Sequence, residues 1–245
     1  MSFQTKNRFR PIFKQFIKLR ENVQNRQKLT KFKKKKWESF LKFYLNKLKN
    51  FRKFKALDHS KYFVTKYGTR GVGYDKRFRD TLHAGKRLRI FYGSLLKKYF
   101  KQKIKTTLKK KESNSKNVKR LETTFLQLFE SRLDIVLYRA KFAPSVRSAR
   151  QLILHGKVYV NEKQVKSKAY DLKKGDIIKL SFDCLELYEN NIINSIKWSI
   201  PPKYLVINYR TLQILFLGDV TSTNLANEFS FNLRLQKVLV NYPRQ

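Results

Sequence analysis

Apolar residues recur every three or four positions in two short segments near the middle of the chain, and this spacing predicts two amphipathic helices. The first apolar stripe runs from Leu133 to Ala140, and the second runs from Val146 to Ile153. Ser145 follows the helix-breaking Ala143-Pro144 and stands where the N-cap of the second helix is expected. Gly156 follows the second stripe, where helices commonly end in a left-handed residue.

Short β-branched runs follow this helix pair. Val158–Val160 predicts a strand, Asn161-Glu162 predicts a turn, and a second strand is expected to continue through Val165. A Lys-Lys-Gly-Asp turn then leads into a last predicted strand over Ile177–Leu180. Residues 130–180 are therefore expected to form one small domain of two helices and a β-hairpin.

Helical spacing also dominates the chain before this domain. Residues 1–62 predict an arm of two or three basic amphipathic helices, and residues 63–129 predict a helical body. Within the body, Lys86–Gln102 is expected to be one helix whose opposite side is basic, and the polar residues 109–119 are expected to connect it to an apolar helix over 121–129. The apolar side of the first of these helices carries Leu88, Phe91, Tyr92, Leu95, Leu96 and Tyr99.

The segment after residue 180 mixes both periods. Cys184–Ser195 predicts a helix, and Tyr204–Ile207, Gln213–Leu217 and Val238–Val240 predict strands. Only six Lys and Arg oppose five Asp and Glu over residues 181–245, so this tail is expected to complete the helical body and to face protein neighbours. The predicted class is α+β: a mostly helical body with a basic N-terminal arm and an inserted helix–helix–hairpin domain.

The charge of the chain points to a polyanionic partner. Its 245 residues carry 57 Lys and Arg against 17 Asp and Glu, a formal net charge of +40. Neutralisation of phosphates with release of counterions explains such an excess. A hydrophobic content of 41% and an aromatic content of 14% argue against a disordered basic chain and for real cores.

The chemistry of enzymes and metal centres is sparse. The single cysteine, Cys184, excludes a disulfide framework and a thiolate cluster for a metal. His59, His83 and His155 are scattered, without ligands at metal-binding spacing. Gly71-x-Gly73 lacks the context of a nucleotide-binding loop. We expect no cofactor, no metal and no small-molecule substrate, and no apolar run approaches the ~20 residues of a membrane span.

The predicted second helix of the small domain has a basic polar side, formed by Arg147, Arg150 and Gln151 at positions i, i+3 and i+4. Arg132 and Arg139 lie two turns apart on the first helix. The basic surface is expected to continue through the turns and onto the body helix. These further cations are His155, Lys157, Lys163, Lys166 and Lys168, together with Lys86, Arg87 and Arg89.

The order of motifs here resembles the small-subunit ribosomal protein "S-four" family. The run is Arg-Leu-Asp, Arg-x-x-Phe-Ala-Pro, Arg-x-x-Ala-Arg-Gln, His-Gly and Val-x-Val-Asn, over about fifty residues from Arg132. Tyr67-Gly68 followed by a basic run ending in Tyr92-Gly93 resembles the body of the same family, and Pro202–Leu205 resembles its tail. One departure is Glu162, where the hairpin turn of the family usually has glycine.

The resemblance implies a fold and a set of partners. It implies a primary binder of small-subunit rRNA at a multi-helix junction, with an RNA-facing set of Arg132, Arg139, Arg147, Arg150, Gln151, His155 and Lys157. We expect Lys163, Lys166, Lys86, Arg87 and Arg89 to bind RNA as well. The resemblance also implies contact with the neighbouring ribosomal protein "S-five", a place near the mRNA entry channel, and an effect on translation accuracy. Contacts to phosphates from two sides would capture the shape of the junction.

Other functions use the same small domain. A free-standing RNA chaperone or stalled-ribosome factor is one alternative, and an RNA-modifying enzyme such as a pseudouridine synthase is another. Because no separate catalytic domain remains, Asp134 is interpreted as a first-turn carboxylate that pairs with the helix dipole and an arginine. The basic arm also permits a membrane-surface helix or a mitochondrial transit peptide. We expect no enzyme activity and no membrane.

The residue palette bears on location. Lys, Asn, Phe, Tyr and Ile are abundant, whereas the chain has only 8 Gly and 5 Pro. The abundant residues have AT-rich codons, which favours an organellar genome and a mitochondrial ribosome. A plastid, or the cytoplasm of an organism with an AT-rich genome, gives the same palette.

Overall fold

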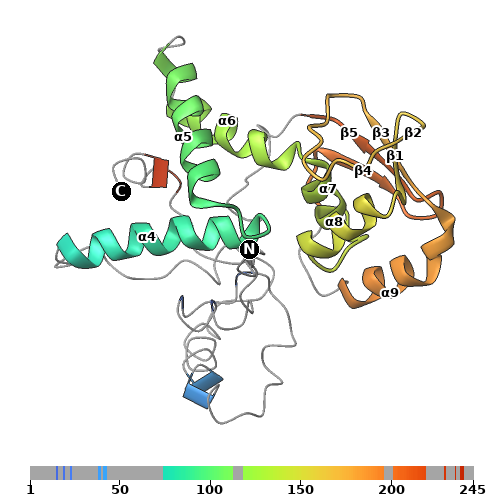
Figure 1. Ribbon diagram of the computed structural model, residues 1–245, viewed down its shortest axis with the longest axis horizontal. Helices are drawn as coiled ribbons and strands as arrows, with labels where there is room; N and C mark the ends of the chain where they lie inside the picture. Colours follow the sequence, from blue (N-terminus) through green and yellow to red (C-terminus); the bar gives the residue numbers. More distant parts are fainter. Residues whose placement is uncertain are drawn as a thin grey trace, which may run out of the picture.

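The computed structural model describes residues 74–112, 118–195 and 201–218 and eleven single positions, and these form two lobes (Figure 1). Helices α4 to α6 form the helical lobe, and α7 through β5 form the sheet lobe (Figure 1). The single positions are Gln15, Leu19, Val23, Glu38, Ser39, Leu41, Lys42, Phe229, Leu235, Val238 and Leu239. Most of the predicted arm over 1–62, and Tyr67-Gly68, lie outside the described residues. The predicted α+β class is confirmed.

The helical lobe consists of α4 (Tyr74–Phe91), α5 (Lys97–Glu112) and α6 (Val118–Glu130). The prediction of one helix over Lys86–Gln102 is wrong, because the chain turns sharply between α4 and α5. Gly93 and Ser94 have φ values of 79° and 60° there, and left-handed residues end a right-handed helix. Leu96, predicted to be on the apolar side, is consequently 55% exposed.

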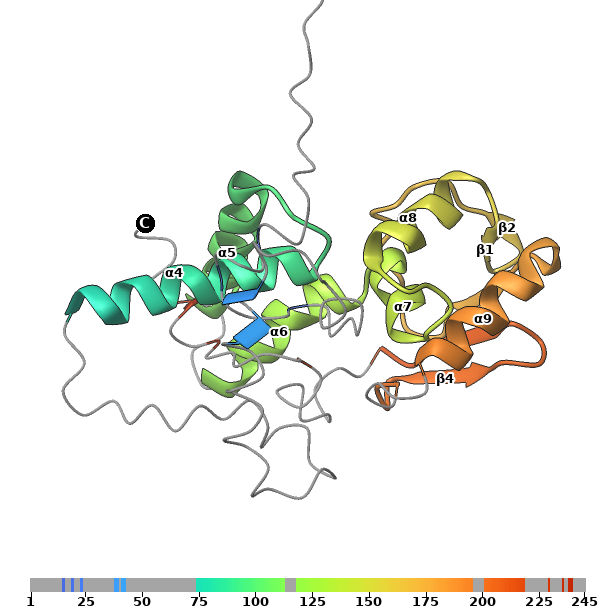
Figure 2. The ribbon, with the colours of Figure 1, turned by 90° about the horizontal axis from the view of Figure 1, so that it is seen from below.

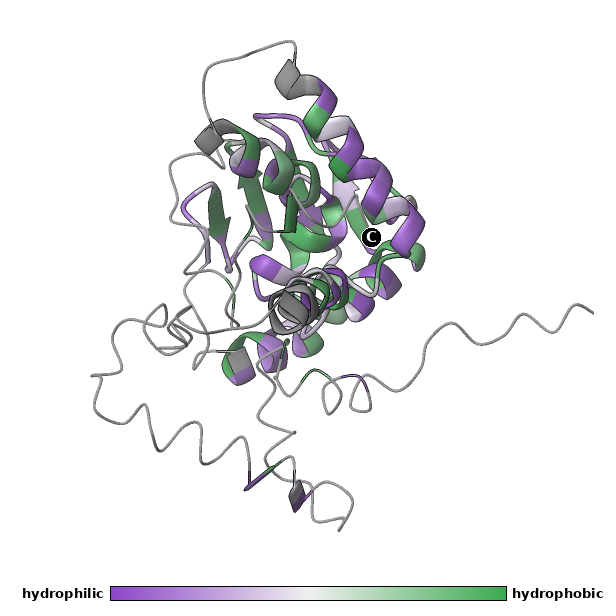
Figure 3. Cartoon of the chain, turned by 90° about the vertical axis from the view of Figure 1, so that its left-hand side faces the viewer, coloured by the Kyte–Doolittle hydropathy of each residue, from purple (hydrophilic) through white to green (hydrophobic). Residues whose placement is uncertain are grey.

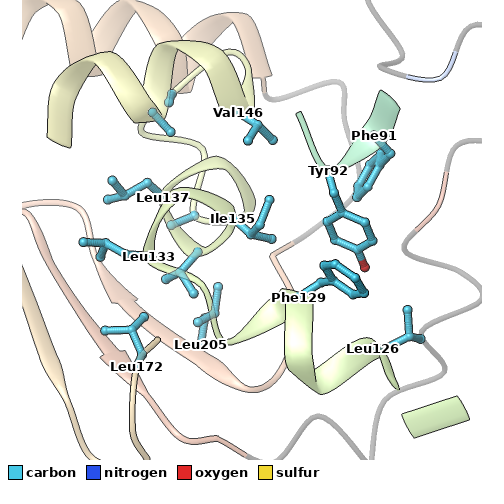
Figure 4. Packing of buried hydrophobic residues seen from close by; sticks show 14 of the residues in the cluster. Phe91, Tyr92, Leu126, Phe129, Leu133, Ile135, Leu137, Val146, Leu172 and Leu205 are labelled. Atoms are coloured by element: carbon cyan, nitrogen blue, oxygen red, sulfur yellow. The ribbon is translucent and has the colours of Figure 1, made fainter. Parts of the chain in front are cut away.

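The sheet lobe begins with the two predicted helices, α7 (Leu133–Arg139) and α8 (Val146–Leu154). The Ser145 hydroxyl accepts a hydrogen bond from the Ser148 amide at 3.2 Å, which confirms the predicted N-cap. Gly156 has a φ of 70° and ends α8 as expected. Apolar residues of both lobes join in one buried cluster, in which Ile135 of α7 points toward Tyr92 and Phe129 (Figure 4).

The sheet is antiparallel, with strand order β2-β1-β3-β5-β4. Its inner face is apolar and buried, whereas its outer face mixes polar residues with exposed apolar ones such as Ile177 and Val206. Asn161 and Glu162 have φ values of 48° and 66°, so the β1–β2 turn is tight even with Glu162 in place of glycine. The strands are β1 (Val158–Val160), β2 (Lys163–Gln164), β3 (Ile177–Leu180), β4 (Leu205–Asn208) and β5 (Gln213–Phe216).

The central domain extends past Leu180, the residue at which the sequence predicted its end. Strand β5 pairs with β3, with Ile178 opposite Ile214, so β4 and β5 extend the sheet of the central domain. A short 3₁₀ turn (Phe182–Cys184) and α9 (Leu185–Ser195), the predicted helix, lie between β3 and β4. Figure 3 shows hydrophobic residues concentrated in the strands and both colours along the amphipathic helices.

The far end of the tail contacts the helical lobe. The Phe229 ring packs edge-on against Phe91 with ring centroids 5.1 Å apart. Val238 and Leu239 are fully buried and helical, so the strand predicted over Val238–Val240 is wrong at these two described residues. The tail therefore divides its residues between the two lobes, because β-pairing to β3 captures its first half.

Candidate nucleic-acid interface

Arg139, predicted to face RNA, lies in the interior and forms an ion pair with Glu130. Its Nη2 and Nε donate to the two carboxylate oxygens at 2.7 and 3.0 Å, and both side chains are almost fully buried. The hydroxyls of Tyr92 and Tyr204 each donate to the same carboxylate at 2.7 Å. The Arg139 guanidinium also lies over the Phe91 ring, 4.9 Å from its centroid.

The Glu130 carboxylate is buried with all of its partners in place. Burial by itself raises the pKa of Glu130, but the Arg139 charge and the hydrogen bonds from Arg139, Tyr204 and Tyr92 outweigh it, so the pKa lies below its usual value. Burial and the neighbouring Glu130 charge raise the pKa of Tyr92. This cluster joins α6, α7, the end of α4 and the start of β4.

A second buried carboxylate, Asp134, lies on α7 and pairs with two arginines. Arg132 donates to its two oxygens at 3.1 and 2.9 Å, and Arg150 Nε donates at 2.7 Å. The predicted pairing of this first-turn carboxylate with an arginine is confirmed. Arg132 is only 5% exposed, although the sequence placed it in the RNA-facing set.

Arg150 also connects the two lobes. Its Nη1 donates to the Gly93 carbonyl at 2.8 Å, and its Nη2 donates to the Tyr92 carbonyl at 3.0 Å. A Cβ on residue 93 would lie 2.5 Å from Nη2 of Arg150. Glycine at this position therefore allows the Arg150 guanidinium to approach the backbone, and it also adopts the positive φ without strain. The structure thereby gives a physical reason for the Tyr92-Gly93 pair. Arg147 donates to the Ser94 hydroxyl at 3.2 Å and joins the same turn.

The basic side of α8 therefore points largely toward the α4–α5 turn. We call the Glu130–Arg139 and Asp134–Arg150 clusters, with Tyr92, Tyr204, Arg132 and Gly93, the interlobe joint. Arginine suits this role because its planar guanidinium can bond two carboxylate oxygens or two carbonyls at once. The sequence pattern gave the helix and its basic residues but not the direction of their side chains, which depends on the two partner carboxylates.

The exposed members of the predicted set lie at the end of α8 and around the hairpin. Gln151, His155, Lys163 and Lys166 are exposed, as is Lys168. Lys157 is partly buried and forms an ion pair with Asp183. On α4, the three predicted cations Lys86, Arg87 and Arg89 are partly buried. Arg87 donates a hydrogen bond to the Leu19 carbonyl, and Arg89 donates one to the Leu95 carbonyl.

Helix α5 adds a cationic surface that the predicted site did not include. Lys97, Lys105 and Lys109 are exposed and fall on one side of the helix at multiples of four residues, with the partly buried Lys101 between them. The sequence shows these residues as a lysine-rich run. Because one continuous helix was predicted over Lys86–Gln102, it was not evident that the lysines lie on a separate helix with its own direction. The sheet lobe likewise exposes Lys173, Lys174 and Lys179, which the predicted set omitted.

Two further findings concern the parts of the chain that the structure describes. Among these residues, no three His, Cys, Asp or Glu side chains gather in an arrangement suited to a metal ion. In the same residues, no helix has both the length and the apolar character needed to cross a membrane.

Comparisons with known proteins match the central part of the chain. Residues 131–178 match the family model of the S4 domain. Small ribosomal subunit protein uS4 of Brucella anthropi is 37% identical over 114 residues, which covers 46% of this chain and 52% of that protein. The uS4 proteins of Brucella ovis and Brucella suis give the same identity and coverage. The matched region thus spans about half the length of these curated relatives.

Proposed function

We propose that this chain belongs to the S4 ribosomal protein family and is a structural, rRNA-binding protein of the small ribosomal subunit. The observation that carries the proposal is the S4 domain match over 131–178 together with 37% identity to uS4 proteins across 114 residues. The net charge of +40 supports a phosphate-rich partner.

The proposed mechanism is the capture of an RNA shape between cations on both lobes. The interlobe joint fixes the sheet lobe against the helical lobe through the buried Glu130–Arg139 ion pair and the hydrogen bonds from Arg150 to the α4–α5 turn. The exposed lysines of α5 lie on one lobe, and those of the hairpin lie on the other. Lysine–phosphate contacts position a protein on RNA without reading its sequence, so the spacing of the two surfaces supplies the selectivity.

Exposure supports a division of the predicted RNA-binding residues into two groups. We place Gln151, His155, Lys163 and Lys166 at the interface, with Lys157, Arg147 and the α5 lysines beside them. Arg132 and Arg139 act through the interlobe joint instead, because a buried guanidinium held by a carboxylate has no free face for a phosphate. Lys86, Arg87 and Arg89 are half-buried and keep only part of their surface for RNA.

The finer parts of the proposal rest on the family resemblance. They are a multi-helix junction of small-subunit rRNA, a neighbour of the S-five type, a place near the mRNA entry channel and an effect on translation accuracy. The AT-rich residue palette supports a mitochondrial ribosome as the location, with a plastid or an AT-rich cytoplasm as the alternative.

The proposal includes no catalysis. Asp134, the aspartate of the Arg-Leu-Asp motif, is fully buried and held by two guanidinium groups. A nucleophilic aspartate must instead reach the reacting base. The geometry of Asp134 therefore supports a structural role.

Sedimentation of the tagged full chain tests the proposal. A lysate separated on a sucrose gradient should place the chain with the small subunit, and sequencing of RNA crosslinked to it should return mainly small-subunit rRNA. A chain that sediments free of the small subunit, or whose crosslinked RNA is mostly tRNA or mRNA, would refute the ribosomal assignment. A modified nucleoside formed on RNA only when the chain is present would favour the enzyme alternative.

A further inference from the structure

Helix α9 and the 3₁₀ turn before it carry no basic residue in a strongly basic protein. Residues 181–195 contain Asp183, Glu186 and Glu189 and no Lys or Arg, whereas the whole chain has a net charge of +40. The helix lies on the sheet lobe, on the side away from the helical lobe (Figures 1 and 2). RNA phosphates would be repelled by these carboxylates, so this part of the lobe suits a different partner.

Large apolar side chains are exposed along the same helix. Phe182, Leu185 and Ile193 are 56%, 41% and 63% exposed. With Glu186 and Glu189 they fall on one side, at spacings of three, four and seven residues. We call these five residues the α9 face. Exposed apolar residues gathered on one face mark interaction sites more often than single exposed residues do.

The α9 face is held rigidly from beneath. Tyr188 is fully buried and packs edge-on against Phe142, with ring centroids 6.0 Å apart. The Asn191 amide donates to the Phe142 carbonyl at 3.0 Å, and Lys157 pairs with Asp183 at the start of the helix. Because the helix is already fixed, a partner pays little ordering entropy on that side of the interface.

We propose that the α9 face is a docking surface for a basic amphipathic helix of another protein. The apolar side chains would pack between those of the partner helix, and Glu186 and Glu189 would pair with its Lys or Arg residues. The arm of this chain has a similar composition, but Leu19 and Val23 of that arm are buried in the main core cluster. This favours a segment from a different protein.

Site-specific photocrosslinking in the full chain tests the surface. A benzoylphenylalanine replaces Ile193 in one variant and Leu96, which is also more than half exposed, in the control. The assembled particles are then irradiated and digested. Mass spectrometry should identify, at position 193, a peptide of another protein with net positive charge and apolar residues at helical spacing. The same probe at Lys163 reports RNA contact separately, so failure of the proposed RNA function leaves the result at position 193 interpretable.

A charge reversal completes the test. Glu186→Lys with Glu189→Lys should lower the yield of that crosslink about tenfold, since each reversal replaces an attraction by a repulsion. Glu162→Lys with Asp171→Lys changes the net charge equally at exposed positions elsewhere and should leave the yield unchanged. If the reversed chain has a lower unfolding midpoint, Glu186→Gln with Glu189→Gln removes the charges more mildly.

Several outcomes would overturn the proposal. They are a crosslink from position 193 to RNA, to a second copy, to the chain's own arm or to an acidic protein, or no crosslink at all. An equal loss of yield in the two charge-reversal variants would also overturn it, because the effect would then follow net charge and not the α9 face.

Discussion

Replacement of Gly93 by alanine tests the interlobe joint at its tightest contact. The new Cβ would lie 2.5 Å from Nη2 and 2.7 Å from Cζ of Arg150. The Arg150 guanidinium must then move, although it donates to the Tyr92 and Gly93 carbonyls and to the buried Asp134 carboxylate. Gly93→Ala should therefore break several charged hydrogen bonds at once.

The expected loss of stability has two parts. An alanine at a φ of 79° costs about 1–2 kcal/mol for its left-handed backbone. Each hydrogen bond to a charged group contributes about 1.5–3 kcal/mol. Because Arg150 can move and regain part of these bonds elsewhere, we expect the two parts together to cost about 3–5 kcal/mol.

Gly175→Ala is the matched control. Gly175 has a φ of 91°, but a Cβ there meets nothing within 4 Å, so this variant carries the backbone cost alone, about 1–2 kcal/mol. Urea unfolding of the full chains, followed by circular dichroism at 222 nm, gives the free energy of unfolding of each variant. Equal losses in the two variants would refute the argument, because the contact with Arg150 would then add nothing to the backbone strain.

Three further predictions concern charge. Arg139→Leu should lower the free energy of unfolding by about 3–5 kcal/mol in urea titrations, because it leaves the Glu130 carboxylate buried without its cationic partner. Lys179→Leu, at an exposed site, is the control, and an equal loss of stability in this variant would contradict the prediction. The pKa of Glu130 in the folded chain lies below its unfolded value near 4.5, so the stability that Glu130 contributes is fully present above pH 4.5 and is lost as the pH falls through the folded pKa. Glu130→Gln should remove this part of the acid dependence of the unfolding midpoint, and an unchanged pH profile in the variant would contradict the prediction. Lys163→Ala with Lys166→Ala should weaken RNA binding in filter assays and lower the log–log salt slope by about 1–2 without changing stability, whereas Arg150→Ala should lower stability as well; unchanged stability of the Arg150→Ala chain would contradict its role in the interlobe joint.

Local patterns were sufficient for most elements of the sheet lobe. The stripe from Val146 to Ile153, the Ser145 cap and the Gly156 terminus depend on neighbouring residues, and each lies where the sequence placed it. The break between α4 and α5 was missed because an apolar stripe continues through it, while only Gly93 and Ser94 adopt left-handed φ values. Periodicity alone does not show where a chain turns.

Long-range contacts decided the rest. The pairing of β5 with β3 joins residues more than thirty positions apart in the chain, and nothing near residue 180 in the sequence announces it. The inward direction of Arg132, Arg139 and Arg150 depends on Glu130 and Asp134, whose burial is a tertiary property. A cationic helix pattern therefore located the candidate site but did not separate the arginines that hold the fold from the lysines that remain exposed.

The hydrogen bond from Tyr204 to Glu130 joins residues 74 positions apart, and this separation has a consequence for synthesis. The chain emerges from the ribosome with its N-terminus first, so Glu130, Arg139 and Tyr92 are available together while Tyr204 is still inside the exit tunnel or not yet synthesised. Arg150 meets the α4–α5 turn earlier, since its partners Tyr92 and Gly93 precede it. The nascent protein thus acquires its two-lobed geometry in stages, and the carboxylate of Glu130 receives its last donor only after residue 204 has emerged.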